Sequence, residues 1–313
     1  MPLVLAAKSI NREHDDENES CRPLGAGEMS SARQMERVPC PCCGETEANV
    51  WATERGFNLV QCADCRLLYV NPRPPMSDID EGVRLGEHRI DGEKVNVRAR
   101  RIPRKVAAYN RMFRSLFSDR IRSGEPIVWV DYGAGYGEII EAVGDVMPPG
   151  TKTIGVEPMV HKAESSRARG LDVRGGYPEP AQFQADVISM VNIFSHVPDF
   201  SDLLRTAATN LKPSGELFIE TGNLADLERR NQFPGILDLP DHLVFSGESQ
   251  MARFLDQAGF QIVEIERHRV DGPVNFAKDV AKALLGRPIV LRPPYSSEYR
   301  QLMIRARLKT SPT

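Results

Sequence analysis

The stretch that decides the fold of this chain reads Val128-Trp129-Val130-Asp131-Tyr132-Gly133-Ala134-Gly135-Tyr136-Gly137-Glu138. Its apolar first half predicts a buried strand over Ile127–Asp131, and the pattern after the glycines predicts a helix over Glu138–Val146. Glycines in the turn between them allow positive φ angles and let backbone N–H groups approach a ligand without hindrance from a Cβ atom. In an open α/β sheet, such a turn lies at the carboxyl edge of the strands, where ligands bind.

The spacing of the glycines and an acid farther along the chain narrow the class of ligand. Gly133, Gly135 and Gly137 are spaced G-x-G-x-G, and Glu138 stands where a dinucleotide-binding loop has its third glycine. The G-K-[ST] of a phosphate-binding loop does not follow these glycines. Glu157 ends the next predicted strand, and a carboxylate at that tip can accept hydrogen bonds from both hydroxyls of a ribose. We therefore expect a nucleoside at this edge of the sheet.

Strand and helix patterns alternate between residues 126 and 270. This alternation implies crossover connections and a mainly parallel sheet with helices on both faces. After the first strand and helix, we predict strands at Thr151–Glu157, Leu171–Arg174, Asp186–Val191, Glu216–Glu220 and Gln261–Glu266, and helices at His161–Arg169, Phe200–Leu211 and Ser249–Ala258.

Several segments, in this order, resemble the class I S-adenosylmethionine-dependent methyltransferases. The glycine stretch looks like their first motif, and Glu157 matches the acid that holds the cofactor ribose. Ala185–Met190 resembles their fourth strand, Asn192–Val197 the segment after it, and Leu211–Leu217 the turn into the fifth strand. The resemblance covers about residues 100–270 and implies an α/β fold with a Rossmann-like sheet and S-adenosylmethionine as the cofactor. The residues that it implies for cofactor binding are Asp131, Tyr132, Gly133, Ala134, Gly135, Gly137, Glu157, Pro158, Asn192 and Ile193.

All the cysteines lie within the first 65 residues. Clustered thiols in a chain that we expect to be in the reducing cytoplasm favour a metal site over a disulfide framework. Cys40/Cys43 and Cys62/Cys65 form two C-x-x-C pairs, and this spacing suits tetrahedral Zn²⁺ in a structural site. Cys42 is the spare thiol, and its exchange for Cys43 stays open.

The unit over residues 37–75 resembles the N-terminal zinc ribbon of a bacterial methyltransferase subgroup. In that subgroup, C-P-x-C-G and C-x-x-C-x-x-x-Y-V-N-P precede the catalytic domain, and both patterns occur here, from Cys40 and from Cys62. The subgroup includes enzymes that methylate carbon atoms of nucleotide-linked sugars. The resemblance therefore implies a small molecule or a nucleotide-linked sugar as the acceptor, methylated at carbon or oxygen.

The remaining segments lie around these two units. Apolar residues at steps of three and four predict an amphipathic helix within residues 97–122, and its other faces are rich in arginine and lysine. A last strand is expected at Leu302–Leu308. The predicted domains are a disordered tail (1–36), the zinc ribbon (37–75), a loop followed by the amphipathic helix (76–125), the cofactor-binding methyltransferase domain (126–270) and a C-terminal extension (271–313).

Two histidines are candidates for a catalytic base, which is needed where the acceptor must lose a proton. His196 follows the fourth predicted strand, at the sheet edge where the methyl donor should point. Its alternative role is to shape the pocket. His242 precedes the last predicted helix of the domain, in a segment where the family that the chain resembles builds its acceptor pockets. The sequence leaves open which of the two acts as the base.

Composition restricts the remaining possibilities. A net charge of −3 and a pI near 6.1 are unlike a strongly basic nucleic-acid-binding protein. The chain has no apolar run of the length that spans a membrane, and we expect a cytoplasmic protein. Two alternatives to the small-molecule enzyme stay open. One is an RNA methyltransferase that grips phosphates with its zinc ribbon and basic helix, and the other is a non-catalytic zinc-binding scaffold that keeps the fold.

Overall fold

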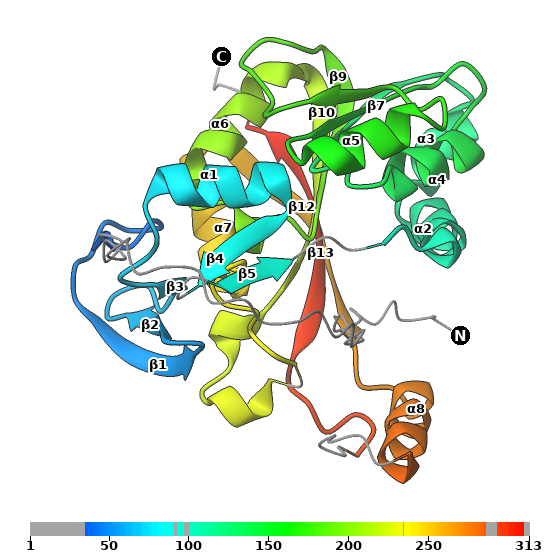
Figure 1. Ribbon diagram of the computed structural model, residues 1–313. Helices are drawn as coiled ribbons and strands as arrows, with labels where there is room; N and C mark the ends of the chain where they lie inside the picture. The colour runs from blue at the N-terminus through cyan, green and yellow to red at the C-terminus, as the bar shows by residue number, and fades with distance from the viewer. Residues whose placement is uncertain (1–34, 91–92, 97–99, 234, 286–292, 310–313) are drawn as a thin grey trace, which may run out of the picture.

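A seven-stranded sheet forms the centre of the molecule (Figure 1). The computed structural model describes residues 35–90, 93–96, 100–233, 235–285 and 293–309, so the tail predicted over residues 1–36 lies almost wholly outside the described residues. In spatial order, the strands of the sheet are β12 (Phe260–Arg269), β13 (Arg300–Leu308), β10 (Leu211–Gly222), β9 (Ala185–Val191), β6 (Val128–Tyr132), β7 (Lys152–Glu157) and β8 (Val173–Gly175). From β10 to β8 the neighbouring strands are parallel, whereas β13 is antiparallel to both β10 and β12.

Helices cover both faces of this sheet, as the alternating pattern predicted. Helices α2 (Pro103–Leu116) and α4 (Glu138–Val146) pack on one face, and α6 (Phe200–Asn210) and α7 (Glu248–Gln257) pack on the other. The buried ring of Phe113 anchors α2, because it lies edge-on to Trp129 of β6 and to Phe218 of β10, with ring centroids 5.1 and 5.8 Å apart. The other helices are α1 (Met76–Leu85), α3 (Ser118–Ser123), α5 (Val160–Arg167) and α8 (Pro273–Leu284).

The cysteine-bearing unit forms a small antiparallel sheet beside the large one (Figure 1). Its strands are β1 (Ala48–Glu54), β2 (Phe57–Cys62), β3 (Leu68–Val70) and, from far along the chain, β11 (Val244–Phe245). The Val70 amide also donates to the carbonyl of Leu243 at 2.8 Å. The ribbon therefore shares a sheet with the segment that follows His242, a pairing that the predicted boundary at residue 75 does not include.

The prediction of a loop over residues 76–96 is wrong. Helix α1 occupies its first half, and a hairpin of β4 (Glu87–Ile90) and β5 (Glu93–Asn96) follows. Two glycines caused the error. Gly82 is buried inside α1, and Gly86 ends the helix at a φ of 69°, with its amide donating to the Gly82 carbonyl at 2.8 Å. They serve close packing and helix termination rather than a loop.

The C-terminal segment is part of the central sheet rather than an extension of it. Strand β13 is inserted between β10 and β12 and pairs with both along its length. Arg305 of β13 holds this arrangement, because it makes a 2.7 Å ion pair with the buried Glu216 of β10. The last strand was predicted, but its place in the sheet does not fit a domain boundary at residue 270. Nothing in the sequence indicates this place, because a local pattern carries no information about which distant strands pair.

Candidate active site and cysteine cluster

The glycine loop after β6 is folded onto the neighbouring strand β7. The amides of Gly133 and Ala134 both donate to the carbonyl of Val156, at 2.8 and 3.0 Å. A Cβ atom on Gly155 would come within 2.7 Å of the Ala134 Cβ atom. Only a glycine at residue 155 therefore lets the loop lie this close to β7.

Glu157, at the tip of β7, binds this loop directly. The amide of Gly135 donates to Glu157 Oε2 at 2.6 Å, and the amide of Met159 donates to Oε1 at 2.9 Å. Each carboxylate oxygen keeps a second lone pair that can accept from a ribose hydroxyl. Gly135 has a φ of +57°, and a Cβ atom built on it would meet nothing within 4 Å, so the loop is open on that side. These residues fit a nucleoside cofactor.

Two residues predicted to bind the cofactor have side chains that point into the core. Asp131 accepts from Ser189 Oγ at 2.5 Å, and Trp129 Nε1 donates to the same hydroxyl at 2.8 Å. Burial raises the pKa of Asp131 to about 8. Tyr132 accepts at its hydroxyl from Asn210 Nδ2 at 2.9 Å. These side chains join β6 to β9 and to α6, and the backbone of both residues pairs with β7 and β9 in the sheet.

The segment after β9 also reaches the loop. A Cβ atom on Gly133 would lie 2.4 Å from Ile193 Cγ2, so Ile193 packs directly on the loop. Asn192 has a left-handed backbone, with a φ of 55°, and its amide donates to the carbonyl of Glu220 at 2.8 Å. Pro158 follows Glu157 in the turn into α5. The structure thus brings Ile193 and Glu157 to the same loop, as the resemblance implied.

Sequence reasoning missed Glu220, which lies near the carboxyl end of β10. Its side chain is 1% exposed, and its Oε1 accepts from Asn192 Nδ2 at 3.3 Å and from Gln301 Nε2. Burial raises the pKa of Glu220 to about 7. The available signal was an acidic residue inside an apolar strand, because a carboxyl group is rarely buried without a reason.

His196 and His242, predicted as alternative bases, lie next to each other. Their ring centroids are 4.6 Å apart, and the rings meet edge-on. His196 Nδ1 lies 3.0 Å from the carbonyl oxygen of Asp241, and His242 Nδ1 lies 2.8 Å from that of Leu237. Because a carbonyl oxygen only accepts, each Nδ1 carries a proton, and Nε2 of a neutral ring is then the atom with the free lone pair.

The pKa values of the two imidazole rings are shifted in opposite directions. Burial, reinforced by the neighbouring His196, lowers the pKa of His242 to about 4. Burial also acts to lower the pKa of His196, but the carboxylate of Asp241 outweighs it and raises this pKa above its ordinary value. His242 is therefore the neutral partner of the pair and His196 the one that favours a proton.

The four cysteines predicted as metal ligands converge on one point. The Sγ atoms of Cys40 and Cys65 are 3.5 Å apart, those of Cys43 and Cys62 are 3.4 Å apart, and all four lie within 4.8 Å of one another. A Zn–S bond of about 2.3 Å in a tetrahedral site places sulfur atoms about 3.8 Å apart. Hydrogen bonds among these thiols lower the pKa of Cys65 and raise that of Cys40, so without a metal the cluster favours a single thiolate that its neighbours share. The cluster is compatible with Zn²⁺, and it includes Cys43 rather than Cys42.

Helix α7 holds both cysteine turns against the catalytic unit. Gln250 Nε2 donates to the carbonyl of Cys65 at 2.5 Å, and Gln257 Nε2 donates to that of Cys42 at 3.4 Å. Arg253, on the same helix, pairs with Asp64 at 3.2 Å. The cysteine-bearing unit is thus attached to a helix that packs on the central sheet.

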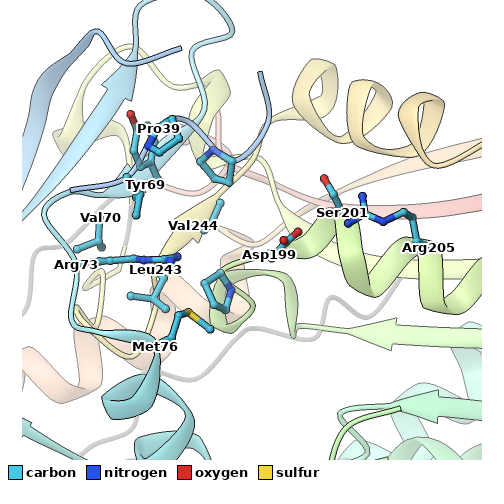
Figure 2. A pocket seen from close by; sticks show the side chains of 13 residues that line it. Pro39, Tyr69, Val70, Arg73, Met76, Asp199, Ser201, Arg205, Leu243 and Val244 are labelled. Atoms are coloured by element: carbon cyan, nitrogen blue, oxygen red, sulfur yellow. The ribbon is translucent and has the colours of Figure 1, made fainter. Parts of the chain in front are cut away.

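A cavity of about 370 Å³ lies where the ribbon meets the start of α6 (Figure 2). Figure 2 shows Arg73 of the ribbon segment and Asp199, which caps α6, on facing walls. Leu243 and Val244 form part of the wall and directly follow His242. The cavity therefore borders the segment that carries one of the two histidines. Its lining residues are Val38, Pro39, Pro41, Tyr69, Val70, Arg73, Met76, Pro198, Asp199, Ser201, Arg205, Leu243 and Val244.

A family model described as a methyltransferase domain matches residues 100–265, more than half of the chain. The match spans the glycine loop, Glu157 and both histidines. The chain belongs to this methyltransferase family. Within the part of the chain that the structure describes, none of the helices of this methyltransferase is long and apolar enough to cross a membrane.

Similar proteins cover this chain in part. C-methyltransferase NovU of Streptomyces niveus is 24% identical over 180 residues, which are 53% of this chain and 40% of NovU. The chain thus spans well under half of the length of this curated relative. Among solved structures, geranyl diphosphate C-methyltransferase from Streptomyces coelicolor A3(2) is 15% identical at a TM-score of 0.49, over 75% of this chain and 100% of that one. The [4+2]-cyclase SpnF is 16% identical at a TM-score of 0.46, over 66% of this chain and 83% of that one.

Proposed function

We propose that this protein transfers a methyl group from S-adenosylmethionine to a small molecule or a nucleotide-linked sugar. The observation that carries the proposal is the 2.6 Å hydrogen bond between the Gly135 amide and Glu157, which joins the glycine loop to the carboxylate suited to a ribose. Both residues lie within the segment that matches the methyltransferase family. When bound, S-adenosylmethionine supplies an electrophilic methyl group. The protein's part is to align the acceptor with that group and to keep water away.

His242 is the base in this proposal. Its Nδ1–H is held by the Leu237 carbonyl, so its Nε2 can take a proton from a C–H or O–H group of the acceptor. Its low pKa keeps the ring in the neutral, accepting form throughout the physiological range. His196, whose pKa is raised by Asp241, would stabilise the negative charge that develops on the acceptor. Two neighbouring groups with opposite pKa shifts are typical of an acid–base pair.

Methylation at carbon is the more specific form of the proposal. NovU is named a C-methyltransferase, and its likeness to this chain supports carbon over oxygen. The RNA alternative depended on the basic residues of α2 and the segment before it. Arg101, one of these residues, makes a 2.5 Å ion pair with Glu141 of α4, which lowers the positive charge available to a phosphate.

Two measurements test the proposal. Calorimetry with S-adenosylmethionine should show saturable binding to the folded protein, and Glu157→Ala should abolish it. An acceptor screen by mass spectrometry, with nucleotide-linked keto sugars, other small molecules and RNA as arms, should then show a mass gain of one methylene unit in a sugar or small molecule. The proposal fails if the folded protein binds no S-adenosylmethionine, or if RNA is the substrate that gains mass.

A further inference from the structure

One buried carboxyl group joins three strands at the carboxyl edge of the sheet. Glu220 of β10 accepts from the side-chain amide of Asn192, which follows β9, and from that of Gln301 on β13. Both bonds reach the same oxygen, Oε1. Glu220 Oε2 is also buried, and among the described residues it has no hydrogen-bond partner.

Burying the Glu220 carboxyl group in this way lowers the stability of the folded chain, which is hard to explain if its only role is structural. A buried polar atom without a partner costs about 1–3 kcal/mol. A glutamine would accept the same bonds at Oε1 without a charge that must be buried. A buried polar group of this kind calls for an explanation, and a binding or catalytic role is one of the few that apply.

The position of Glu220 connects it to the glycine loop. Asn192 directly precedes Ile193, and Ile193 packs on Gly133 so closely that a Cβ atom there would lie 2.4 Å from Ile193 Cγ2. Glu220 also receives a backbone bond, since its carbonyl accepts from the Asn192 amide at 2.8 Å. Glu220 therefore fixes both the backbone and the side chain of the turn that contacts the loop.

Among the residues that the structure describes, few positive charges act on Glu220. The charged or titratable groups that act on it or share its environment are Lys105 and Tyr109 of α2, Asp131 of β6, Glu138 of α4 and Tyr299 before β13. Lys105 is the one cation among them, and it favours the ionised form of Glu220. Asp131 is itself buried, with its pKa raised to about 8. A positively charged ligand would complement this group of acids.

We propose that Glu220 is a positioning residue of the cofactor site, which fixes Asn192 beside the glycine loop and supplies negative charge for a cationic sulfonium nucleoside. The inference rests on the proposed function, since that function provides the sulfonium. As a consequence, binding of the cofactor is linked to the release of a proton. Before binding, Glu220 is partly protonated near pH 7. A cation nearby favours the carboxylate, so binding moves the proton from Glu220 to the buffer.

Calorimetry in two buffers of different ionisation enthalpy measures this proton directly. At pH 7, S-adenosylmethionine should release up to about half a proton per site, the fraction carried by a group whose pKa equals the pH. S-adenosylhomocysteine, which lacks the sulfonium charge, should release less. Glu220→Gln should abolish the release and weaken binding of S-adenosylmethionine about tenfold, the equivalent of one pKa unit of coupling.

Two further variants separate the roles. Asn192→Ala should weaken binding but keep the proton release, because the carboxyl group remains. Glu248→Gln, which removes an exposed carboxylate paired with Arg267, is the control and should behave as the parent protein. If Glu220→Gln does not fold, Gln301→Leu takes its place. It removes one donor to the carboxylate and should shift the pH of maximal release upward.

The outcomes are distinguishable. A release that persists in Glu220→Gln would assign the proton to Asp131 and overturn the inference, as would equal release with both nucleosides. For Gln301→Leu, an unchanged pH of maximal release would overturn it. Absence of binding by both nucleosides to the folded parent protein would instead refute the proposed function.

Discussion

His196 and His242 lie with their ring centroids 4.6 Å apart, and their environments favour opposite states of protonation. The pKa of His242 is lowered to about 4 by burial, and the carboxylate of Asp241 raises that of His196 above its ordinary value against the effect of burial. The pair therefore holds one neutral and one readily protonated imidazole in contact, although the two residues are far apart in the sequence.

The first prediction concerns the titration of the two rings. Followed by NMR of the imidazole C–H signals, His242 should titrate near pH 4 and His196 above 6.5. Since the folded pKa of His242 is below its unfolded value of 6.5, its contribution to stability should be complete above pH 6.5 and lost as the pH falls through 4. Asp241→Asn should lower the pKa of His196. Two rings that titrate together at their ordinary value would refute the prediction.

The second prediction concerns turnover. Once an acceptor is identified, His242→Gln should lower kcat on the order of a hundredfold, the usual contribution of a general base. Calorimetric binding of S-adenosylmethionine should stay unchanged. The matched control is His268→Gln, which removes an imidazole paired with Glu266 on β12. Equal activity of the two variants would remove His242 from the role of base.

The third prediction separates the effect of backbone strain on stability from that of a steric collision, both at Gly133. Gly133 and Gly124 both have positive φ angles, of +73° and +71°, but only a Cβ atom on Gly133 would collide with Ile193. Backbone strain alone should cost Gly124→Ala about 1 kcal/mol in the free energy of unfolding, and Gly133→Ala should cost clearly more. Thermal or denaturant unfolding measures both. Adding Ile193→Ala to Gly133→Ala should restore part of the loss, and the absence of any restoration would contradict the collision.

The fourth prediction concerns the cysteine cluster. The purified protein should contain about one zinc ion per chain. Cys65→Ser should lose the metal and lower the temperature of unfolding of the whole chain, because Gln250 and Arg253 tie α7 to the cysteine turns. Cys42→Ser should retain the metal, since the Cys42 thiol, although it hydrogen-bonds to Cys65, is not among the four thiols that all lie within 4.8 Å of one another. Loss of metal in both variants would show that Cys42 is a ligand.

The fifth prediction concerns stability and pH. The pKa of Glu220 rises from an ordinary value of 4.5 to about 7 in the folded chain, so the native state binds this proton more tightly than the unfolded state does. Stability should therefore fall as the pH rises from 4.5 to 7, by about 3 kcal/mol from this group, and then level off. Denaturant unfolding of the parent and of Glu220→Gln across this range should show the gap opening in favour of the variant. A constant gap would contradict the buried carboxyl group.

Local patterns were sufficient for much of the fold and for one half of the site. Helix Glu138–Val146 has the predicted bounds, because its apolar positions and the glycine before it are both local signals. Gly135 and Glu157 meet as expected, since parallel neighbouring strands end at the same edge of a sheet. Each C-x-x-C pair lies on one tight turn, closed by an amide that donates to the carbonyl of Cys40 or Cys62, so the two thiols of a pair come together.

The features that escaped prediction depend on contacts between distant segments. Nothing in residues 243–245 indicates that they extend the sheet of the ribbon. Nothing near Glu220 indicates that Asn192 and Gln301 converge on its carboxyl group. The sequence does not distinguish a glycine inside α1 from a glycine in a loop. The burial of Gly82 within the helix becomes visible only in the folded structure.

The position of β13 in the sheet has a consequence for folding during translation. This strand pairs on one side with β10 and on the other with β12, and both of these are synthesised before it. The gap between them has to stay open until residues 300–308 have left the exit tunnel. Two β edges are exposed during that interval, and exposed edges favour aggregation. The central sheet therefore reaches its final topology only after residues 300–308 have emerged.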